Sequence, residues 1–160
     1  MAERIVINSG PLISLSRMRA LHILEQLPFG FFTPSEVKAE LTAGPADILS
    51  TGFPSSVITA QLKTKRSEQL FGNLDSGEAA VIQLALEMQI ERVCIDELKG
   101  RKEAVRQGLR PIGSLGLLGR AKSLGIIVEI KPFIMKAILA GIYYDEVLIA
   151  DFLPNFGESW

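Results

Sequence analysis

The chain has 160 residues, of which 48% are apolar and 22% are charged, and its formal net charge is −1. These values are typical of a globular protein, and they exclude a disordered chain and a uniformly basic nucleic-acid-binding protein, although a local basic patch is still compatible with them. The length predicts a single domain over residues 1–160. Mean hydropathy is +0.27, which we interpret as an apolar surface covered by a partner or a second copy.

The sequence also bears on compartment. Every apolar run is too short to span a membrane, and the first residues lack the features of a secretory signal peptide. The single cysteine, Cys94, has no intrachain disulfide partner and lies in an apolar run. We interpret it as a small core residue in a reducing compartment. A cytoplasmic protein without membrane contact is therefore expected.

The first elements predicted along the chain are a strand, a helix and a second strand. Residues 4–8 form a short β-branched run that stops at a turn signal, Asn8-Ser9-Gly10-Pro11. Apolar residues at helical spacing then predict one helix over residues 12–27. Three phenylalanines predict a second buried strand over residues 29–32.

The next segment has the pattern of a helix start. Thr33 is placed as an N-cap, Pro34 as the first helical residue and Glu36 as the reciprocal cap, in a helix that contains Glu40. An edge strand is expected within residues 57–62.

The second half alternates between helix and strand more clearly. A helix is predicted over residues 74–88, a strand buried on both faces over 92–95, and a helix over 99–107 that Gly108 ends. A short strand over 109–112 follows.

Three further helices are expected over residues 114–122, 133–141 and 144–153, the first closing at Gly125. Strands that alternate with helices indicate a parallel sheet covered by helices on both faces, which is an α/β fold.

Polar side chains fall where the predicted strands end and the helices begin. They are Asn8, Glu40, Glu78 and Asp96, followed by Glu97. Ligand sites of open parallel sheets lie outside the carboxyl ends of the strands, so these side chains are expected to meet at one edge. Mg²⁺ prefers oxygen ligands and keeps several waters, so two or three carboxylates suffice to hold one. Ser114 follows the last strand, where it adds a hydroxyl to this edge or caps its helix.

Each of these residues also has a purely structural interpretation. Asp75 and Glu78 have the spacing of a capping box, so Glu78 would only support its helix. Glu40 would be a solvated helix residue, Asp96 a surface acid at a helix start, and Asn8 a turn former. The joint placement of the four at one edge is what favours a site.

Basic residues follow the acids on the next helix. Lys99, Arg101 and Lys102 are candidates for contacts with a nucleic-acid backbone. The alternative is a solvated face balanced by neighbouring glutamates. His22 interrupts an apolar helix without a second metal-type residue at ligand spacing, so a packing or surface role is expected for it.

Five stretches in this order carry a family resemblance: IVINSGPLI, TPSEVKAEL, LDSGEAAVIQLA, IDExxGRxxA and IGSLGLLxxAK. Together they resemble the PIN-domain superfamily, specifically a small bacterial and archaeal branch of it. The similarity covers nearly the whole chain, including the ending Gly157-Glu158.

The resemblance implies a three-layer α/β/α fold and cleavage of RNA that depends on Mg²⁺ or Mn²⁺. Many relatives are toxins of toxin–antitoxin pairs, so an antitoxin partner is implied, and we expect a homodimer. By position, Glu40, Glu78 and Asp96 match the family's catalytic and metal-binding acids. Glu97 matches an accessory acid and Ser114 a polar residue near the site.

The chain departs from the family at the end of the first strand, where an aspartate is usual and Asn8 stands here. Asparagine offers a carbonyl oxygen without the negative charge. Two function classes follow: a metal-dependent endoribonuclease, favoured by Glu40, Glu78 and Asp96, and a binding module without catalysis, favoured by Asn8. A phospho-acceptor signalling domain ranks below both, because Asn8-Ser9 provides no pair of acids.

Overall fold

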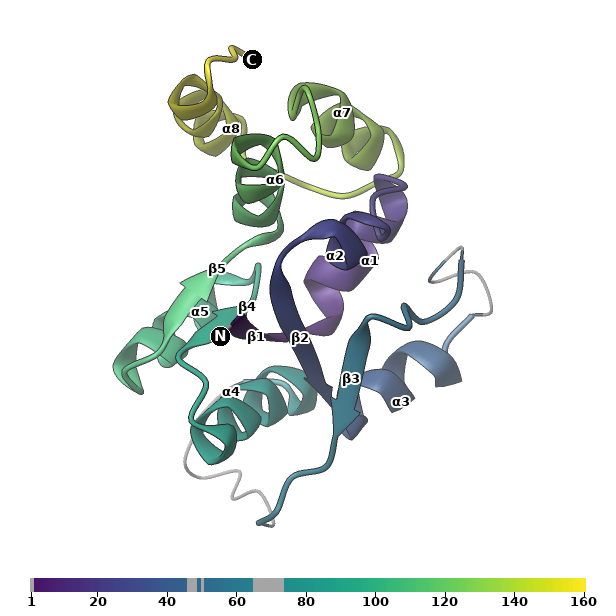
Figure 1. Cartoon of the computed structure of the whole chain (residues 1–160), viewed down its shortest axis with the longest axis vertical. Coiled ribbons are helices and arrows are strands. Elements are labelled where there is room, and N and C mark those ends of the chain that lie inside the picture. Colours follow the sequence, from purple (N-terminus) through teal and green to yellow (C-terminus); the bar gives the residue numbers. More distant parts are fainter. Residues whose placement is uncertain (1, 46–48, 50, 65–73) are drawn as a thin grey trace.

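A computed structural model describes residues 2–45, 49, 51–64 and 74–160, and it has a central five-stranded sheet (Figure 1). All pairings are parallel and the strand order is β3-β2-β1-β4-β5, as the alternation of strands and helices predicted. The strands are β1 Glu3–Ile7, β2 Phe29–Pro34, β3 Val57–Ala60, β4 Arg92–Cys94 and β5 Arg110–Ile112.

Helices connect the strands and form the two outer layers of an α/β/α arrangement. The helices are α1 Ser9–Arg17, α2 Ile23–Gln26, α3 Ser35–Ala43, α4 Ser76–Met88, α5 Leu98–Arg106, α6 Ser114–Ser123, α7 Lys131–Leu139 and α8 Glu146–Phe152, with a 3₁₀ segment at Leu153–Phe156. Among the described residues, no helix is both long and apolar enough to cross a bilayer.

The strand order reverses direction between β1 and β4. From β1 the chain moves outward to β2 and β3, and then returns across the sheet to β4 and β5. Right-handed crossovers therefore place the helices that follow β1 and β4 on opposite faces of the sheet. The helices diverge at this point, which leaves the carboxyl ends of β1 and β4 open for a site.

The core is centred on β1. Ile5, Val6 and Ile7 have no exposed surface, as a central strand with helices on both faces requires. Helix α4 packs against β1, β2 and β4, and its run of small and branched residues, Ala79, Ala80, Val81 and Ile82, is buried. These contacts fix the start of α4 beside the strand ends.

The single helix predicted over residues 12–27 is wrong, because the structure has two helices there. Helix α1 ends in a Schellman motif, in which Arg19 adopts a left-handed φ of 55°. The backbone N–H of Ala20 donates to the carbonyl of Leu15, and that of Arg19 to the carbonyl of Ser16. Apolar spacing continued through this break, so periodicity alone did not reveal it.

The helix start predicted at Thr33 is also displaced. Thr33 and Pro34 belong to β2, and α3 begins at Ser35. The Thr33 hydroxyl donates to the carbonyl oxygen of Ile7 at 2.7 Å instead of capping α3. The other predicted elements, including the edge strand within residues 57–62, are confirmed to within a few residues.

The end of the chain is attached to the fold through Glu158. Its carboxylate accepts hydrogen bonds from the backbone N–H groups of Ile130 and Lys131 at 2.8 and 3.0 Å, and from Lys122 Nζ at 2.8 Å. Glu158 therefore satisfies free N–H groups at the start of α7 and joins them to α6. Burial raises the pKa of this carboxyl, but the hydrogen bonds outweigh it and the net pKa is lowered.

We expect Glu158→Gln to lower the free energy of unfolding by about 1–3 kcal/mol at pH 7, because it removes charge-assisted hydrogen bonds. A carboxyl with a lowered pKa stabilises the fold above its ordinary value of 4.5, and that contribution is lost as the pH falls below it. Urea unfolding at pH 7 and pH 4 measures both effects. Glu129→Gln, at an exposed glutamate, is the control, and equal losses in the two variants would contradict the role of Glu158.

Candidate functional site

Asn8 lies at the carboxyl end of β1, beside the end of β4. It follows β1 directly, and its backbone N–H donates to the carbonyl of Cys94 at 3.0 Å, which ties the ends of β1 and β4 together. The Asn8 side chain is only 6% exposed. Its Oδ1 atom is buried without a hydrogen-bond partner in the described part of the chain. Such an orphaned acceptor is unusual in a folded protein and needs an explanation.

Glu40 and Asp75 approach Asn8 around Gly77, at the start of α4. A Cβ built on Gly77 would lie 3.0 Å from Glu40 Oε2, 3.3 Å from Asn8 Oδ1 and 3.5 Å from Asp75 Oδ1. Three oxygen atoms from three segments therefore surround the space that a side chain at position 77 would occupy. Desolvation by burial raises the pKa of Glu40 most, the negative charge of Asp75 raises it further, and a hydrogen bond with Ser9 lowers it.

Asp75, Glu78 and Glu97 form a carboxylate cluster. Each offers an oxygen atom, and these atoms lie within 4.8 Å of one another. Asp75 caps α4, since its Oδ1 accepts the N–H of Glu78 at 2.8 Å, so the predicted cap is present. Glu78 is only 3% exposed, and its carboxyl group lies against Gly100 of α5, 3.4 Å from where a Cβ would be.

The crowding perturbs Glu78 strongly. Burial, a hydrogen bond with Glu97 and the negative charges of Asp75 and Glu97 together raise the pKa of Glu78 to about 8. The charged form is disfavoured because desolvation and like charges act in the same direction. A cation among these oxygens would reverse that effect.

Asp96 belongs to a second polar network beside the cluster. Its Oδ1 accepts from the backbone N–H of Ser114 at 2.7 Å and from the Ser114 hydroxyl at 3.1 Å. The Ser114 Oγ in turn lies 2.7 Å from the hydroxyl of Tyr144. Burial raises the pKa of Asp96, against the hydrogen bonds from Ser114 and the charge of Arg101.

The predicted residues are thus divided between two groups. Glu78 and Glu97 lie in the carboxylate cluster, while Glu40 and Asn8 meet it through Asp75 and Gly77. Asp96 and Ser114 form the neighbouring network.

Sequence reasoning took Asp75 only as a cap and did not single out Tyr144. The signal for Asp75 was its position three residues before Glu78. Nothing in the sequence pointed to Tyr144, because its partner Ser114 lies 30 residues away.

The basic residues of α5 face different ways. Lys99 and Lys102 are exposed, so their ammonium groups are available to phosphates. Arg101 is partly buried, and its Nη1 donates to the carbonyl of Ile95 at 3.1 Å. The same atom and Asp96 Oδ1 lie 3.1 and 3.0 Å from the Cβ position of Gly113. Arg101 therefore supports the Asp96 side of the site.

The donor set suits a hard divalent cation. The cluster and its surroundings supply carboxylate oxygens and one amide oxygen, which are the ligands that Mg²⁺ and Mn²⁺ prefer. The orphaned Oδ1 of Asn8 would gain a partner, and the repulsion among Asp75, Glu78 and Glu97 would be neutralised. The residues present fit the metal.

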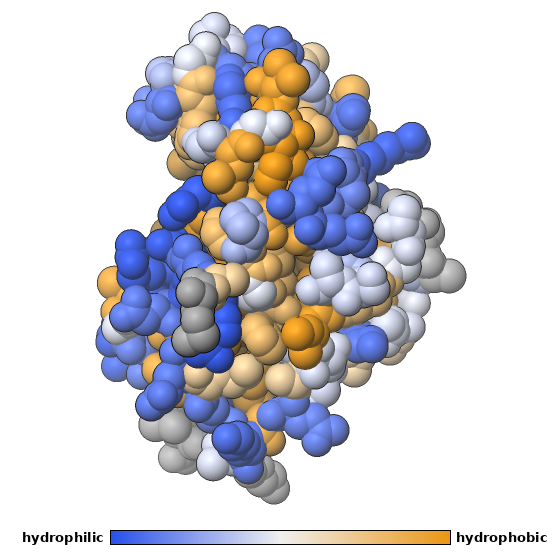
Figure 2. Space-filling model, in the orientation of Figure 1, coloured by the Kyte–Doolittle hydropathy of each residue, from blue (hydrophilic) through white to orange (hydrophobic). Residues whose placement is uncertain are grey.

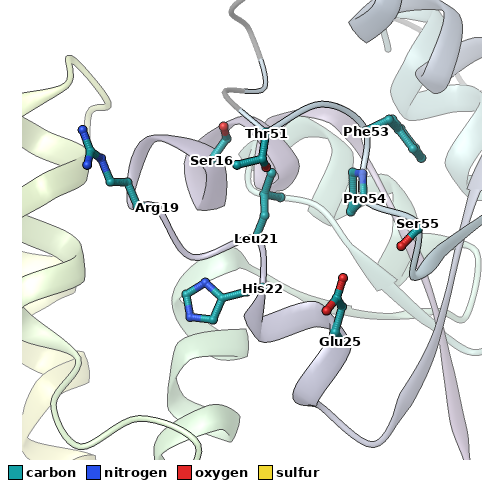
Figure 3. Close-up of a pocket in the computed structure, with 9 residues that line it drawn as sticks. All are labelled: Ser16, Arg19, Leu21, His22, Glu25, Thr51, Phe53, Pro54 and Ser55. Carbon is teal, nitrogen blue, oxygen red and sulfur yellow. The ribbon is translucent and has the colours of Figure 1, made fainter.

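A cavity of about 640 Å³ lies away from this edge, between α2 and the segment before β3 (Figure 3). Arg19, His22, Glu25 and Phe53 are among its lining residues. His22 is exposed at this cavity, and the carboxylate cluster contributes nothing to its walls.

The raised pKa of Glu78 has a consequence for stability in metal-free buffer. A carboxyl with a raised pKa contributes stability that is fully present below its ordinary value of 4.5 and is lost as the pH rises through about 8. We expect Glu78→Gln, which does not ionise, to lose this decline and to be more stable than the unaltered protein at pH 8. Urea unfolding in EDTA at pH 5 and pH 8 measures the difference. Glu91→Gln, an exposed site, is the control, and identical pH dependence in all three proteins would refute the prediction.

Comparison with protein families gives an independent result. Residues 4–158 match the model of a PIN domain family. A search of curated proteins finds no match to the chain. PIN domains generally use divalent metal ions, which agrees with the acidic cluster at the strand ends. The match extends over nearly all 160 residues, and the chain belongs to the PIN domain family.

Proposed function

We propose that this protein is a metal-dependent endoribonuclease. The observation that carries the proposal is the convergence of acids with the orphaned amide oxygen of Asn8 at the point where the strand order reverses. Open parallel sheets bind ligands at this point. Buried acids with perturbed pKa values cluster at functional sites, because repulsion between like charges does not stabilise a fold.

In this proposal Glu40, Glu78 and Asp96 hold one or two Mg²⁺ or Mn²⁺ ions, with Asn8 as a neutral ligand. The bound metal would polarise the phosphodiester and lower the pKa of an attacking water. Ser114 orients the Asp96 carboxylate through its backbone N–H and its hydroxyl.

The other residues support the site or the substrate. Glu97 adds negative charge beside Glu78. Lys99 and Lys102 bind the RNA backbone without reading its sequence. Arg101 contributes positive charge from a position held by its bond to Ile95.

The alternative is a PIN domain that binds RNA or protein without cleavage. Asn8 favours it, because the end of β1 lacks the negative charge usual in the family. The retained Glu40, Glu78 and Asp96 favour the enzyme.

We expect RNA cleavage that requires Mg²⁺ or Mn²⁺ and falls by at least ~10–100-fold in Asp96→Asn, because changes around a metal commonly cost that much. Asn8→Asp should increase cleavage if the missing charge limits it. Gel assays on a labelled RNA with each metal and with EDTA measure both effects. If the Asn8→Asp variant cleaves RNA and the unaltered protein does not, the unaltered protein is a binding module without catalysis. Activity that persists in Asp96→Asn would show that Asp96 is not a catalytic residue.

Many members of the superfamily that the chain resembles are toxins of toxin–antitoxin pairs, which suggests a biological setting. We propose that the chain acts in the cytoplasm as a single-domain toxin, restrained by an antitoxin protein. The buried free thiol of Cys94 suits a reducing compartment. Growth arrest on expression, absent with Asp96→Asn, is the result that this role requires.

We also propose a homodimer formed through an exposed apolar surface on α7, α8 and the loop between them. Figure 2 shows apolar residues exposed on the upper part of the molecule, where α6 and α7 lie in Figure 1. Ile138 of α7, Tyr143 of the loop and Val147 of α8 line one hollow, so α7 and α8 contribute to a common surface. The α7–α8 surface consists of Met135, Ile138, Leu139, Tyr143, Val147 and Leu148.

Its charges suit a second copy of the chain. Lys136 is exposed on α7, whereas Asp145 and Glu146 are exposed at the start of α8. A two-fold axis that sets α7 of one chain against α8 of the other would pair opposite charges twice, as self-complementary interfaces do.

We expect Leu139→Glu to convert the dimer into a monomer, because it places a charge on a side chain that is 87% exposed and would be covered. Light scattering coupled to size exclusion measures the molar mass. Val105→Glu places a charge on another exposed apolar side chain, in α5, and should leave the dimer intact. A dimeric Leu139→Glu variant, or a monomeric unaltered protein, would argue against this interface.

A further inference from the structure

The end of β1 lacks a negative charge, and a carboxylate from another segment lies close to it. Asn8 Oδ1 and Asp75 Oδ1 lie 3.3 and 3.5 Å from the same point, the Cβ position of Gly77, and Glu40 Oε2 lies 3.0 Å from it. Asp75 stands at the N-cap of α4, about as near to this space as Asn8 is.

Asp75 also lies close to two other acids. It shares the carboxylate cluster with Glu78 and Glu97, whose ligand atoms lie within 4.8 Å of its own. One Asp75 oxygen accepts the N–H of Glu78, but an ionised carboxylate has about four acceptor positions. Asp75 can therefore cap α4 and bind a cation at the same time.

A second observation supports a ligand in this space. The Asn8 side chain is 94% buried and its Oδ1 has no partner among the described residues. The atom faces the glycine around which Glu40 and Asp75 are arranged. No described residue donates to this amide oxygen, and a cation held between it and the oxygens of Glu40 and Asp75 would satisfy all three.

Gly77 keeps the space open. A side chain at this position would come within 3.0 Å of Glu40 Oε2 and would compete with the ligand. Gly77 lies in α4, where the helical backbone does not require glycine. The space between the three oxygen atoms is therefore the reason for a residue without a side chain.

We infer that Asp75 is a cation ligand that supplies the negative charge absent at Asn8, so the charge has moved from the end of β1 to the start of α4. The inference rests on the cation site of the proposed function, but it concerns binding and not cleavage.

The test is Mn²⁺ binding without RNA, measured by the electron paramagnetic resonance signal of free Mn²⁺. Asp75→Asn removes the charge and keeps a good N-cap residue, so the melting temperature in EDTA should stay close to that of the unaltered protein. We expect its Mn²⁺ dissociation constant to rise by about tenfold or more. The double variant Asn8→Asp/Asp75→Asn returns a charge to β1 and should recover most of the lost affinity.

Asp145→Asn is the matched control. Asp145 caps α8 through the N–H groups of Val147 and Leu148, so the same change is made at another N-cap, in a different element from the cluster. It should leave Mn²⁺ affinity unchanged.

Unchanged Mn²⁺ affinity in Asp75→Asn, no recovery in the double variant, or no Mn²⁺ binding by the unaltered protein would each overturn the inference and leave Asp75 as a cap only. The result of the RNA cleavage assay is independent of the result for Mn²⁺ binding. Binding that depends on Asp75 without RNA cleavage refutes the nuclease and retains the inference, whereas cleavage with binding indifferent to Asp75 does the reverse.

Discussion

The hydrogen bond from the Asn8 N–H to the Cys94 carbonyl joins the ends of β1 and β4, and the site is built around that junction. The strand order reverses there, so the helices that follow the two strands leave on opposite faces. Polar side chains from four segments then form the two neighbouring groups of the candidate site. Asn8 and Asp96 follow the strands, while Glu40 and Glu78 come from α3 and α4.

The same arrangement works against stability. Glu78 is nearly fully buried beside two other carboxylates, and its raised pKa shows that ionisation is unfavourable there. A fold selected only for stability would place apolar or paired groups at this position. Conflict of this kind is expected at a functional site, where the surrounding core offsets the cost. Here that core is β1 and the buried face of α4.

The C-terminal part of the chain contacts the candidate site although it lies far from it in sequence. Tyr144, from the loop between α7 and α8, contacts Ser114, which holds Asp96. Glu158 fixes the start of α7 to α6. The loop between α7 and α8 therefore contacts the polar network around Asp96.

The sequence by itself determined the alternation of strands and helices, the parallel sheet and the positions of Asn8 and Asp96 after strand ends. These features follow from local periodicity, from turn residues and from the rule that parallel strands share a carboxyl edge. The resemblance to PIN domains was also carried by short ordered motifs. The sequence did not predict the end of α1 near Arg19, because apolar spacing continued across it. Thr33 does not cap α3 as expected, because its hydroxyl bonds to the carbonyl of Ile7.

Only the tertiary structure decided which acids meet. Asp75 reads as a cap in the sequence, and its closeness to Glu97, Glu40 and Asn8 depends on how α4 is set against β1, α3 and α5. Burial of Glu78, the orphaned oxygen of Asn8 and the contact of Tyr144 with Ser114 are likewise long-range results. Distances between side chains of separate elements are set by packing, and a linear pattern contains no record of them.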